Sequence, residues 1–162
     1  MSGWNRWEPS ESDEQICVFE WAAVMQPKVP ELQLLFHIPN GGYRNKATAA
    51  RMKAEGVKAG VPDLFLPVAR NGAHGLFIEM KKRKGGKVRE EQYTWGKALT
   101  FEGYQFTICR GADDAIGCIC DYLGVKELGM RNEKLEMRNE KLGMRNEKLG
   151  MRNEKLGMRN EE

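Results

Sequence analysis

The chain lacks any long apolar run. Among its 162 residues, no stretch approaches the roughly 18 apolar residues that a membrane-spanning helix needs. The N-terminus also lacks the basic region followed by an apolar core that marks a secretion signal. Both absences predict a cytoplasmic protein that does not enter a membrane.

Cysteine and histidine are scarce, with 4 and 2 residues respectively. The cysteines have no paired C-x-x-C spacing, which predicts reduced structural thiols rather than disulfides or a zinc site. They are Cys17, Cys109, Cys118 and Cys120. A nucleotide-binding loop of the G-x-x-x-x-G-K type is also missing, and this argues against an enzyme acting on a small nucleotide.

Positive charge is in only slight excess, because the chain has 26 Lys and Arg residues and 23 Asp and Glu residues. The basic residues nevertheless gather in two runs, which suit contact with a phosphate backbone. Two solvated surfaces would show the same pattern. One run is Lys81, Lys82, Arg83, Lys84, Lys87 and Arg89, and the other is Arg44, Lys46, Arg51, Lys53 and Lys58.

The end of the chain is a repeat of the heptapeptide Gly-Met-Arg-Asn-Glu-Lys-Leu. Its Met and Leu positions alternate at spacings of about five and two, whereas the seam of a coiled coil needs three and four. A glycine in most repeats also costs a helix about 1 kcal/mol each. We therefore predict that residues 125–162 form a disordered or weakly helical tail, with a dimerising helix as the alternative. Residues 1–10 are predicted to be an N-terminal extension.

Residues 11–124 are predicted to form one domain of eight short elements. Ser10 and Asp13 can cap a first helix that Pro27 ends, and Gly56 and Gly124 can end two later helices. The predicted helices are residues 11–25, 47–55, 90–101 and 113–123, and the predicted strands are residues 34–38, 61–66, 76–81 and 105–109.

The fold predicted from this order, α-β-α-β-β-α-β-α, is α/β with a mixed central sheet flanked by helices. Strands 61–66 and 76–81 are joined across Asn71-Gly72, a dipeptide that favours a hairpin connection. They should therefore be neighbours and antiparallel. A hairpin inside a helix–strand alternation argues against a purely parallel, doubly wound sheet.

Three charged residues on these two strands form the candidate site. Side chains alternate faces along a strand, so Glu79 and Lys81 point the same way. Asp63 interrupts an otherwise apolar strand, where a carboxylate without a partner is costly. Pairing of the two strands can bring all three together, although an ordinary cross-strand salt bridge would use the same residues.

Two carboxylates beside an ammonium suit phosphodiester hydrolysis. Carboxylates hold Mg²⁺ or Mn²⁺, and such ions activate water and relieve phosphate charge. In this interpretation Asp63 and Glu79 are metal ligands, and the backbone carbonyl of Ile78 or Met80 adds an oxygen. Lys81 positions the water or stabilises the phosphate in the transition state.

The motifs Gly60-Val61-Pro62-Asp63-Leu64 and Ile78-Glu79-Met80-Lys81, followed by Gln92 in the next predicted helix, resemble the PD-(D/E)XK nuclease superfamily, and within it the VRR-NUC branch. The likeness extends over about residues 11–124. It implies a restriction-endonuclease-like core, and stand-alone members of this branch are common in phages and bacteria.

The resemblance also implies further site residues. A glutamate of the first helix would complete the metal site, and we favour Glu11 over Glu14, with Glu20 the weakest candidate. Gln92 would contact the water or metal shell, although it could be only a surface residue. His37 and Asn40 would lie near the DNA path, and His37 is not assigned as a general base. The other predicted DNA contacts are Arg44, Lys46, Lys58, Lys82, Arg83, Lys84 and Lys87.

The function that the resemblance implies is a Mg²⁺- or Mn²⁺-dependent DNA endonuclease, cleaving branched DNA as a homodimer in the manner of a Holliday junction resolvase. A monomeric flap or end nuclease is the alternative within the same class. A module that binds DNA structures without cutting them is the alternative from another class. Retention of Asp63, Glu79 and Lys81 together argues for the enzyme.

Overall fold

The computed structural model describes residues 9–39 and 46–125, and Asn40, Arg44, the side chain of Lys46 and the repeats lie outside these residues. Within them the elements follow the predicted order, with one short 3-10 helix added. They are α1 (Glu11–Met25), η1 (Pro30–Leu34), β1 (Phe36–His37), α2 (Lys46–Ala54), β2 (Leu64–Leu66), β3 (Leu76–Lys81), α3 (Glu90–Phe101), β4 (Gln105–Arg110) and α4 (Ala112–Leu123). No helix of the described residues combines the length and apolarity needed to cross a membrane.

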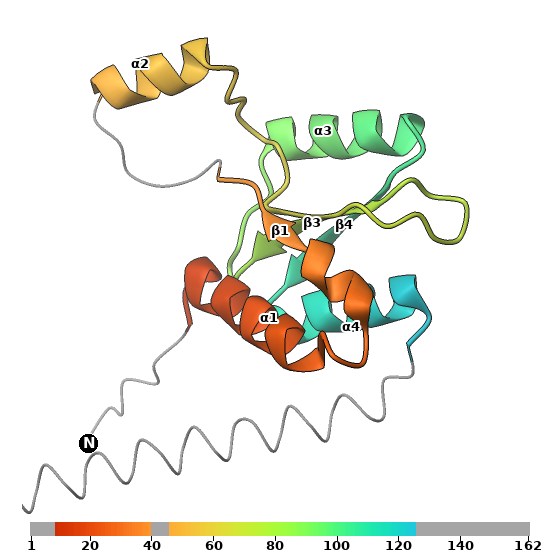
Figure 1. Cartoon of the computed structure of the whole chain (residues 1–162). Coiled ribbons are helices and arrows are strands. Elements are labelled where there is room, and N and C mark those ends of the chain that lie inside the picture. The colour runs from red at the N-terminus through yellow and green to blue at the C-terminus, as the bar shows by residue number, and fades with distance from the viewer. Residues whose placement is uncertain (1–8, 40–45, 126–162) are drawn as a thin grey trace, which may run out of the picture. The chain divides into compact units, whose positions relative to one another are not determined.

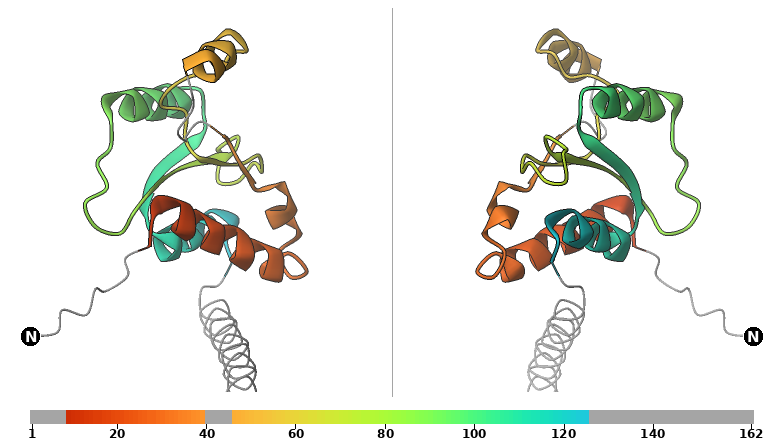
Figure 2. Two further views of the ribbon diagram at one scale, coloured as in Figure 1. Left: turned by 90° about the vertical axis from the view of Figure 1, so that its left-hand side faces the viewer. Right: turned by 90° about the vertical axis from the view of Figure 1, so that its right-hand side faces the viewer.

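The four strands form one mixed sheet in the order β1-β2-β3-β4, which confirms the predicted fold class. β1 and β2 pair antiparallel, as do β2 and β3, while β3 and β4 pair parallel. Helices α1 and α4 lie on one face of the sheet and α3 lies on the other, whereas α2 stands apart from both layers (Figures 1 and 2). The sheet is therefore covered on both faces, as expected.

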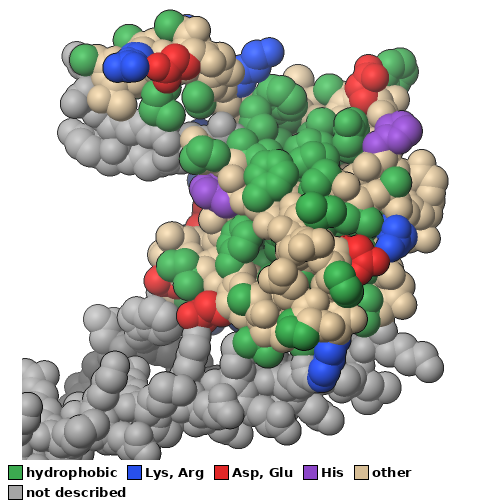
Figure 3. Space-filling model, viewed as in Figure 1, with side chains coloured by type: hydrophobic (Ala, Val, Ile, Leu, Met, Phe, Trp, Pro, Cys, Tyr) green, Lys and Arg blue, Asp and Glu red, His purple; other side chains and the backbone are tan. Residues whose placement is uncertain are grey.

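The two faces of the sheet differ in character. Leu64, Leu66, Ile78 and Met80 are buried and belong to the face that α1 and α4 cover. The opposite face carries Glu79 at one end and a group of aromatic rings at the other. These rings are Phe36, Phe65, Phe77 and Tyr104, which contact one another edge to face or stacked. Part of the group is exposed, and Figure 3 shows hydrophobic side chains gathered on this side of the molecule.

Local sequence signals account for several boundaries. Ser10 caps α1, because its hydroxyl accepts the Asp13 N–H while the Asp13 carboxylate accepts the Ser10 N–H. Asn71 and Gly72 have positive φ angles of 52° and 80°, the conformation of a type I′ turn, so the hairpin prediction is confirmed. Gly124 ends α4 in the left-handed conformation, also as predicted.

Two strand predictions were too long. Residues 34–38 were predicted to be one strand, but the 3-10 helix ends at Leu34 and only Phe36–His37 is extended and paired. Pro30 starts that helix, because its fixed φ suits a first helical position. Asp63 lies one residue before β2 rather than inside it. Its side chain accepts the Met80 N–H at 2.9 Å.

Candidate active site

The sheet register brings Asp63 to Glu79. Leu64 pairs with Ile78, and extending this antiparallel register by one residue places Asp63 opposite Glu79. The Asp63 Oδ2 atom accepts the Met80 N–H at 2.9 Å. The Asp63 carbonyl in turn accepts the Ile38 N–H at 2.7 Å. Both the backbone and the carboxylate of Asp63 are thus held by neighbouring strands.

Lys81 is buried beside the same carboxylates. Its side chain is only 5% exposed, and its Nζ atom donates to Glu79 Oε1 at 2.5 Å and to the Met80 carbonyl at 2.8 Å. Both partners lie on β3 itself. Glu79 shares a face with Lys81, because residues two apart on a strand point the same way, and Met80 is the preceding residue. The Met80 carbonyl, predicted to be a metal ligand, therefore contacts the ammonium in this structure.

Gln92 joins α3 to the site. As the third residue of the helix it accepts the Arg89 N–H through its Oε1 atom at 2.8 Å. Because that oxygen is used at the helix start, the amide Nε2 points at the sheet and donates to Glu79 Oε1. Gln92 is buried, so the alternative of a surface helix residue is wrong.

Glu79 lies in an environment that opposes its charge. Burial is the largest influence and raises its pKa, the hydrogen bond from Lys81 lowers it, and the nearby Asp63 carboxylate raises it again. The resulting pKa of Glu79 is about 7. A carboxyl group that changes protonation near neutral pH, next to a second acid, is typical of functional sites.

The carboxylate oxygens at this site fit a divalent cation in part. Glu79 Oε2 is buried and has no hydrogen-bond partner among the described residues, and the Asp63 carboxylate lies next to Glu79. A buried oxygen without a donor is costly unless something compensates it, and a hard cation would do so. In the described part of the chain, however, no three His, Cys, Asp or Glu side chains are grouped closely enough to hold an ion. The described residues thus bring together two adjacent carboxylates, and the third acidic ligand stays a prediction.

The three glutamates of α1 have different surroundings. Glu11 is about half exposed, and its Oε2 atom lies 3.9 Å from Lys81 Nζ, at the edge of the site. Glu14 is buried and turned to other partners: Arg83 at 2.7 Å and the Ala112 N–H, also at 2.7 Å. Glu20 is exposed and further along the helix. Of the three, Glu11 has its carboxylate within ion-pair distance of Lys81, so it stays the favoured candidate for the predicted third ligand.

The predicted DNA-binding residues fall into three groups. His37 is exposed, and its Nδ1 atom lies 2.9 Å from the Asp63 carbonyl, which can only accept, so Nδ1 carries the proton in this contact. Lys58 and the loop lysines Lys82, Lys84 and Lys87 are exposed. Arg83 instead bonds Glu14 and Asp113. Their roles toward DNA stay predictions.

Sequence reasoning did not assign Glu14 its structural role. Its carboxylate receives the first N–H of α4 and the Arg83 guanidinium, and the Cβ of any side chain at Gly111 would approach it to 3.3 Å. The only available signal was its position three residues after Glu11, on the same side of α1 as the buried Val18.

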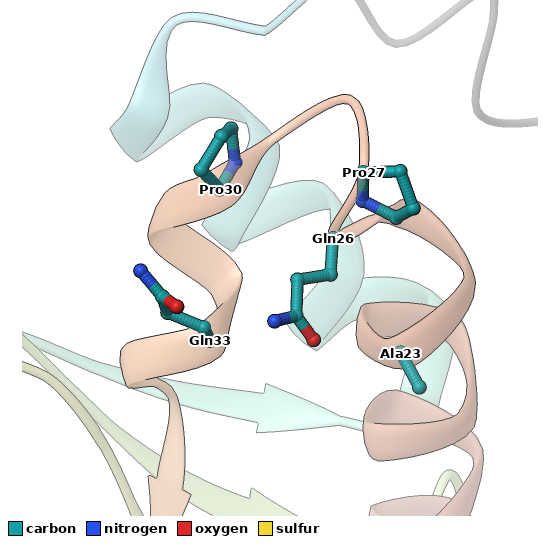
Figure 4. A pocket seen from close by; sticks show the side chains of 5 residues that line it. All are labelled: Ala23, Gln26, Pro27, Pro30 and Gln33. Atoms are coloured by element: carbon teal, nitrogen blue, oxygen red, sulfur yellow. The ribbon is translucent and has the colours of Figure 1, made fainter.

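A surface pocket elsewhere on the domain has a different character. It lies where α1 meets η1, has a volume of about 250 Å³ and is lined by Ala23, Gln26, Pro27, Pro30 and Gln33 (Figure 4). None of these lining residues is charged, so the pocket offers nothing for hydrolysis or phosphate binding.

Comparison with known proteins agrees with this geometry. The family profile of the VRR-NUC domain matches residues 11–113. A solved structure named VRR_NUC domain protein is 31% identical, with a TM-score of 0.63, and the match covers 74% of this chain and 93% of that one. No curated protein matches the sequence. The matched residues contain Asp63, Glu79, Lys81 and Gln92, and the chain thus belongs to the VRR-NUC family of nucleases.

Proposed function

We propose that this nuclease is a Mg²⁺- or Mn²⁺-dependent DNA endonuclease whose site is Asp63, Glu79 and Lys81, with Gln92 and Glu11 beside them. The observation that supports it best is the buried Glu79 Oε2 atom, which has no hydrogen-bond partner among the described residues and lies next to the Asp63 carboxylate. A cation bound at this place would supply an activated water and would relieve phosphate charge.

The protein side chains divide the remaining work. Asp63 and Glu79 would hold the cation. Gln92 fixes the orientation of the Glu79 carboxylate through the hydrogen bond to Oε1. Lys81, whose ammonium lies 2.5 Å from Glu79, would orient the attacking water or hold a phosphate oxygen. Exposed Lys58, Lys82, Lys84 and Lys87 would contact the DNA backbone.

Replacing Asp63 tests the site. We expect Asp63→Asn to lower Mg²⁺-dependent cleavage roughly 100-fold or more, because the cation loses one of its ligands, while DNA binding stays measurable. Cleavage is measured on labelled DNA with Mg²⁺, with Mn²⁺ and with EDTA. Asp121→Asn, at an exposed position on α4, is the matched control and should cut like wild type. If Asp63→Asn cut as fast as this control, the site assignment would be discarded.

We propose branched DNA as the substrate and a homodimer as the active form, in the manner of a Holliday junction resolvase. Two sites related by a two-fold axis could cut two strands of a symmetric junction. A panel of linear, flap and four-way DNAs, combined with light scattering of the protein, tests both points. A monomer that prefers flaps or ends would support the alternative nuclease. DNA binding without cleavage under either metal would support a non-catalytic binding module.

A further inference from the structure

The segment that leads into Asp63 is attached to α3. The Trp95 indole Nε1 donates to the Ala59 carbonyl at 3.0 Å, and the Lys58 ammonium lies 6.0 Å from the centre of the Trp95 ring. Residues 57–62 belong to no helix or strand, and at their start the Val57 N–H donates to the Met52 carbonyl at 2.9 Å. The contact with Trp95 anchors the middle of this segment.

Gly60 brings the same segment directly against the first turn of α3. Its φ angle is +82°, a conformation that favours glycine. A Cβ atom at this position would lie 2.7 Å from the Glu91 Cβ atom and 2.8 Å from the Glu91 carbonyl carbon. These distances are too short for real atoms, so only glycine permits this approach. The segment and α3 are in close backbone contact.

The chain between these anchors and the catalytic acid has little freedom. Asp63 follows Ala59 after a short stretch that includes the fully buried Pro62, whose ring fixes its own φ. We therefore expect a displacement at Ala59 to reach Asp63, whose carboxylate is also held by the Met80 N–H.

Helix α3 also holds the other acid. Gln92, three residues before Trp95 and so on the same side of the helix, donates to Glu79 Oε1. Helix α3 thus contacts the Glu79 carboxylate directly, and it contacts the segment that leads to Asp63 at Ala59. We propose that Trp95 is a positioning residue, which sets the placement of Asp63 relative to Glu79 by holding the Ala59 carbonyl. The consequence for cation binding rests on the proposed function, whereas the placement itself does not.

The first test is Trp95→Phe, which keeps an aromatic ring and removes the indole N–H. Hydrogen exchange of residues 57–66 is measured in EDTA, and Mn²⁺ affinity is measured by electron paramagnetic resonance. We expect faster exchange in residues 57–63 and roughly tenfold weaker Mn²⁺ binding, with thermal unfolding nearly unchanged. In cleavage, kcat should fall more than KM for DNA rises, since the variant deletes no side chain that is proposed to contact DNA.

Trp21→Phe is the matched control. Trp21 is buried in α1, and its Nε1 atom has no hydrogen-bond partner among the described residues. This change should lower the unfolding temperature, because it leaves a cavity, and should leave exchange in residues 57–63 as in wild type. A merely structural role for Trp95 would make both variants behave alike and would overturn the proposal.

A second pair of variants tests the contact without touching Trp95. Gly56→Ala and Gly60→Ala both force alanine into positive φ, but a Cβ meets nothing within 4 Å at Gly56 and meets Glu91 at Gly60. We expect only Gly60→Ala to speed exchange in residues 57–63 and to weaken Mn²⁺ binding. Equal behaviour of the two would contradict the proposal. If wild type bound no Mn²⁺, the proposed function would fail, and the exchange data would still decide the role of Trp95.

Discussion

At the scale of single residues, Glu79 shows a conflict between stability and function. Its side chain is buried on the central strand β3, with one oxygen bonded by Lys81 and Gln92 and the other without a donor. Burial opposes the charged form, and nothing among the described residues fully compensates it. Such a position adds little stability, which agrees with the proposed role of this carboxylate in cation binding.

Metal-free protein should therefore lose stability as Glu79 ionises. The pKa of Glu79 in the folded protein, about 7, lies above the ordinary value of 4.5. The neutral carboxyl group therefore makes its full contribution to the free energy of unfolding below about pH 4.5. That contribution is lost as the pH rises through about 7. We expect Glu79→Gln to remove this dependence, which amounts at most to something on the order of 3 kcal/mol. Urea unfolding in EDTA at about pH 5 and about pH 8 measures it. A wild-type pH dependence identical to that of Glu79→Gln would contradict this.

At the scale of elements, the loop after β3 combines two roles in adjacent residues. Lys82, Lys84 and Lys87 are exposed, while Arg83 binds Glu14 of α1 at 2.7 Å and Asp113 of α4 at 2.7 Å. The pKa of Arg83 is raised chiefly by its hydrogen bonds to Glu14. Arg83 therefore ties the loop to the helical layer, and the lysines beside it face solvent.

These roles predict different effects of mutation. Replacing Lys82, Lys84 and Lys87 with Ala should reduce the salt dependence of DNA binding, by about 0.9 in slope for each phosphate that the variant no longer neutralises. Binding titrations at several salt concentrations measure this slope.

Arg83→Ala is the contrasting variant. It should instead lower the free energy of unfolding by about 2 kcal/mol, because Glu14 stays buried without its guanidinium partner while the guanidinium itself is half exposed. If the triple lysine variant kept the wild-type slope of DNA affinity against salt concentration, this loop would not be part of the DNA-binding surface.

At the scale of the whole molecule, the buried apolar residues of the described part lie between α1 and α4 along the chain. Buried apolar residues run from Val18 in α1 to Tyr122 in α4, and the Tyr122 hydroxyl donates to the Val68 carbonyl at 2.5 Å. This bond joins α4 to the segment after β2. The family match also lies within this part, at residues 11–113.

We therefore expect a chain ending at Val125 to unfold at the same temperature as the full chain and to cut DNA at the same rate. The reason is that the last buried contacts of the described residues precede this point. Thermal unfolding, light scattering and cleavage rates compare the two chains. Loss of cleavage or of dimer in the shorter chain would show that the heptapeptide repeats take part.

Local sequence determined much of this protein. The α1 capping box, the Asn71-Gly72 turn and the left-handed Gly124 each follow from interactions within a few residues, and each was predicted correctly. Strand alternation alone put Glu79 and Lys81 on one face. The motifs around Asp63 and Glu79 also indicated the family, because residue types and spacing coincide there.

Only the tertiary structure decided what depends on contacts between distant segments. Glu11 and Glu14 have different contacts because of the way α1 packs against α4 and the loop after β3. The sequence alone does not distinguish two glutamates that lie so close together. The anchoring of Ala59 by Trp95 joins residues 36 apart, and no local pattern reports it. Propensity and periodicity act over a few residues, whereas the position of each carboxylate depends on which strand or helix the fold places against it.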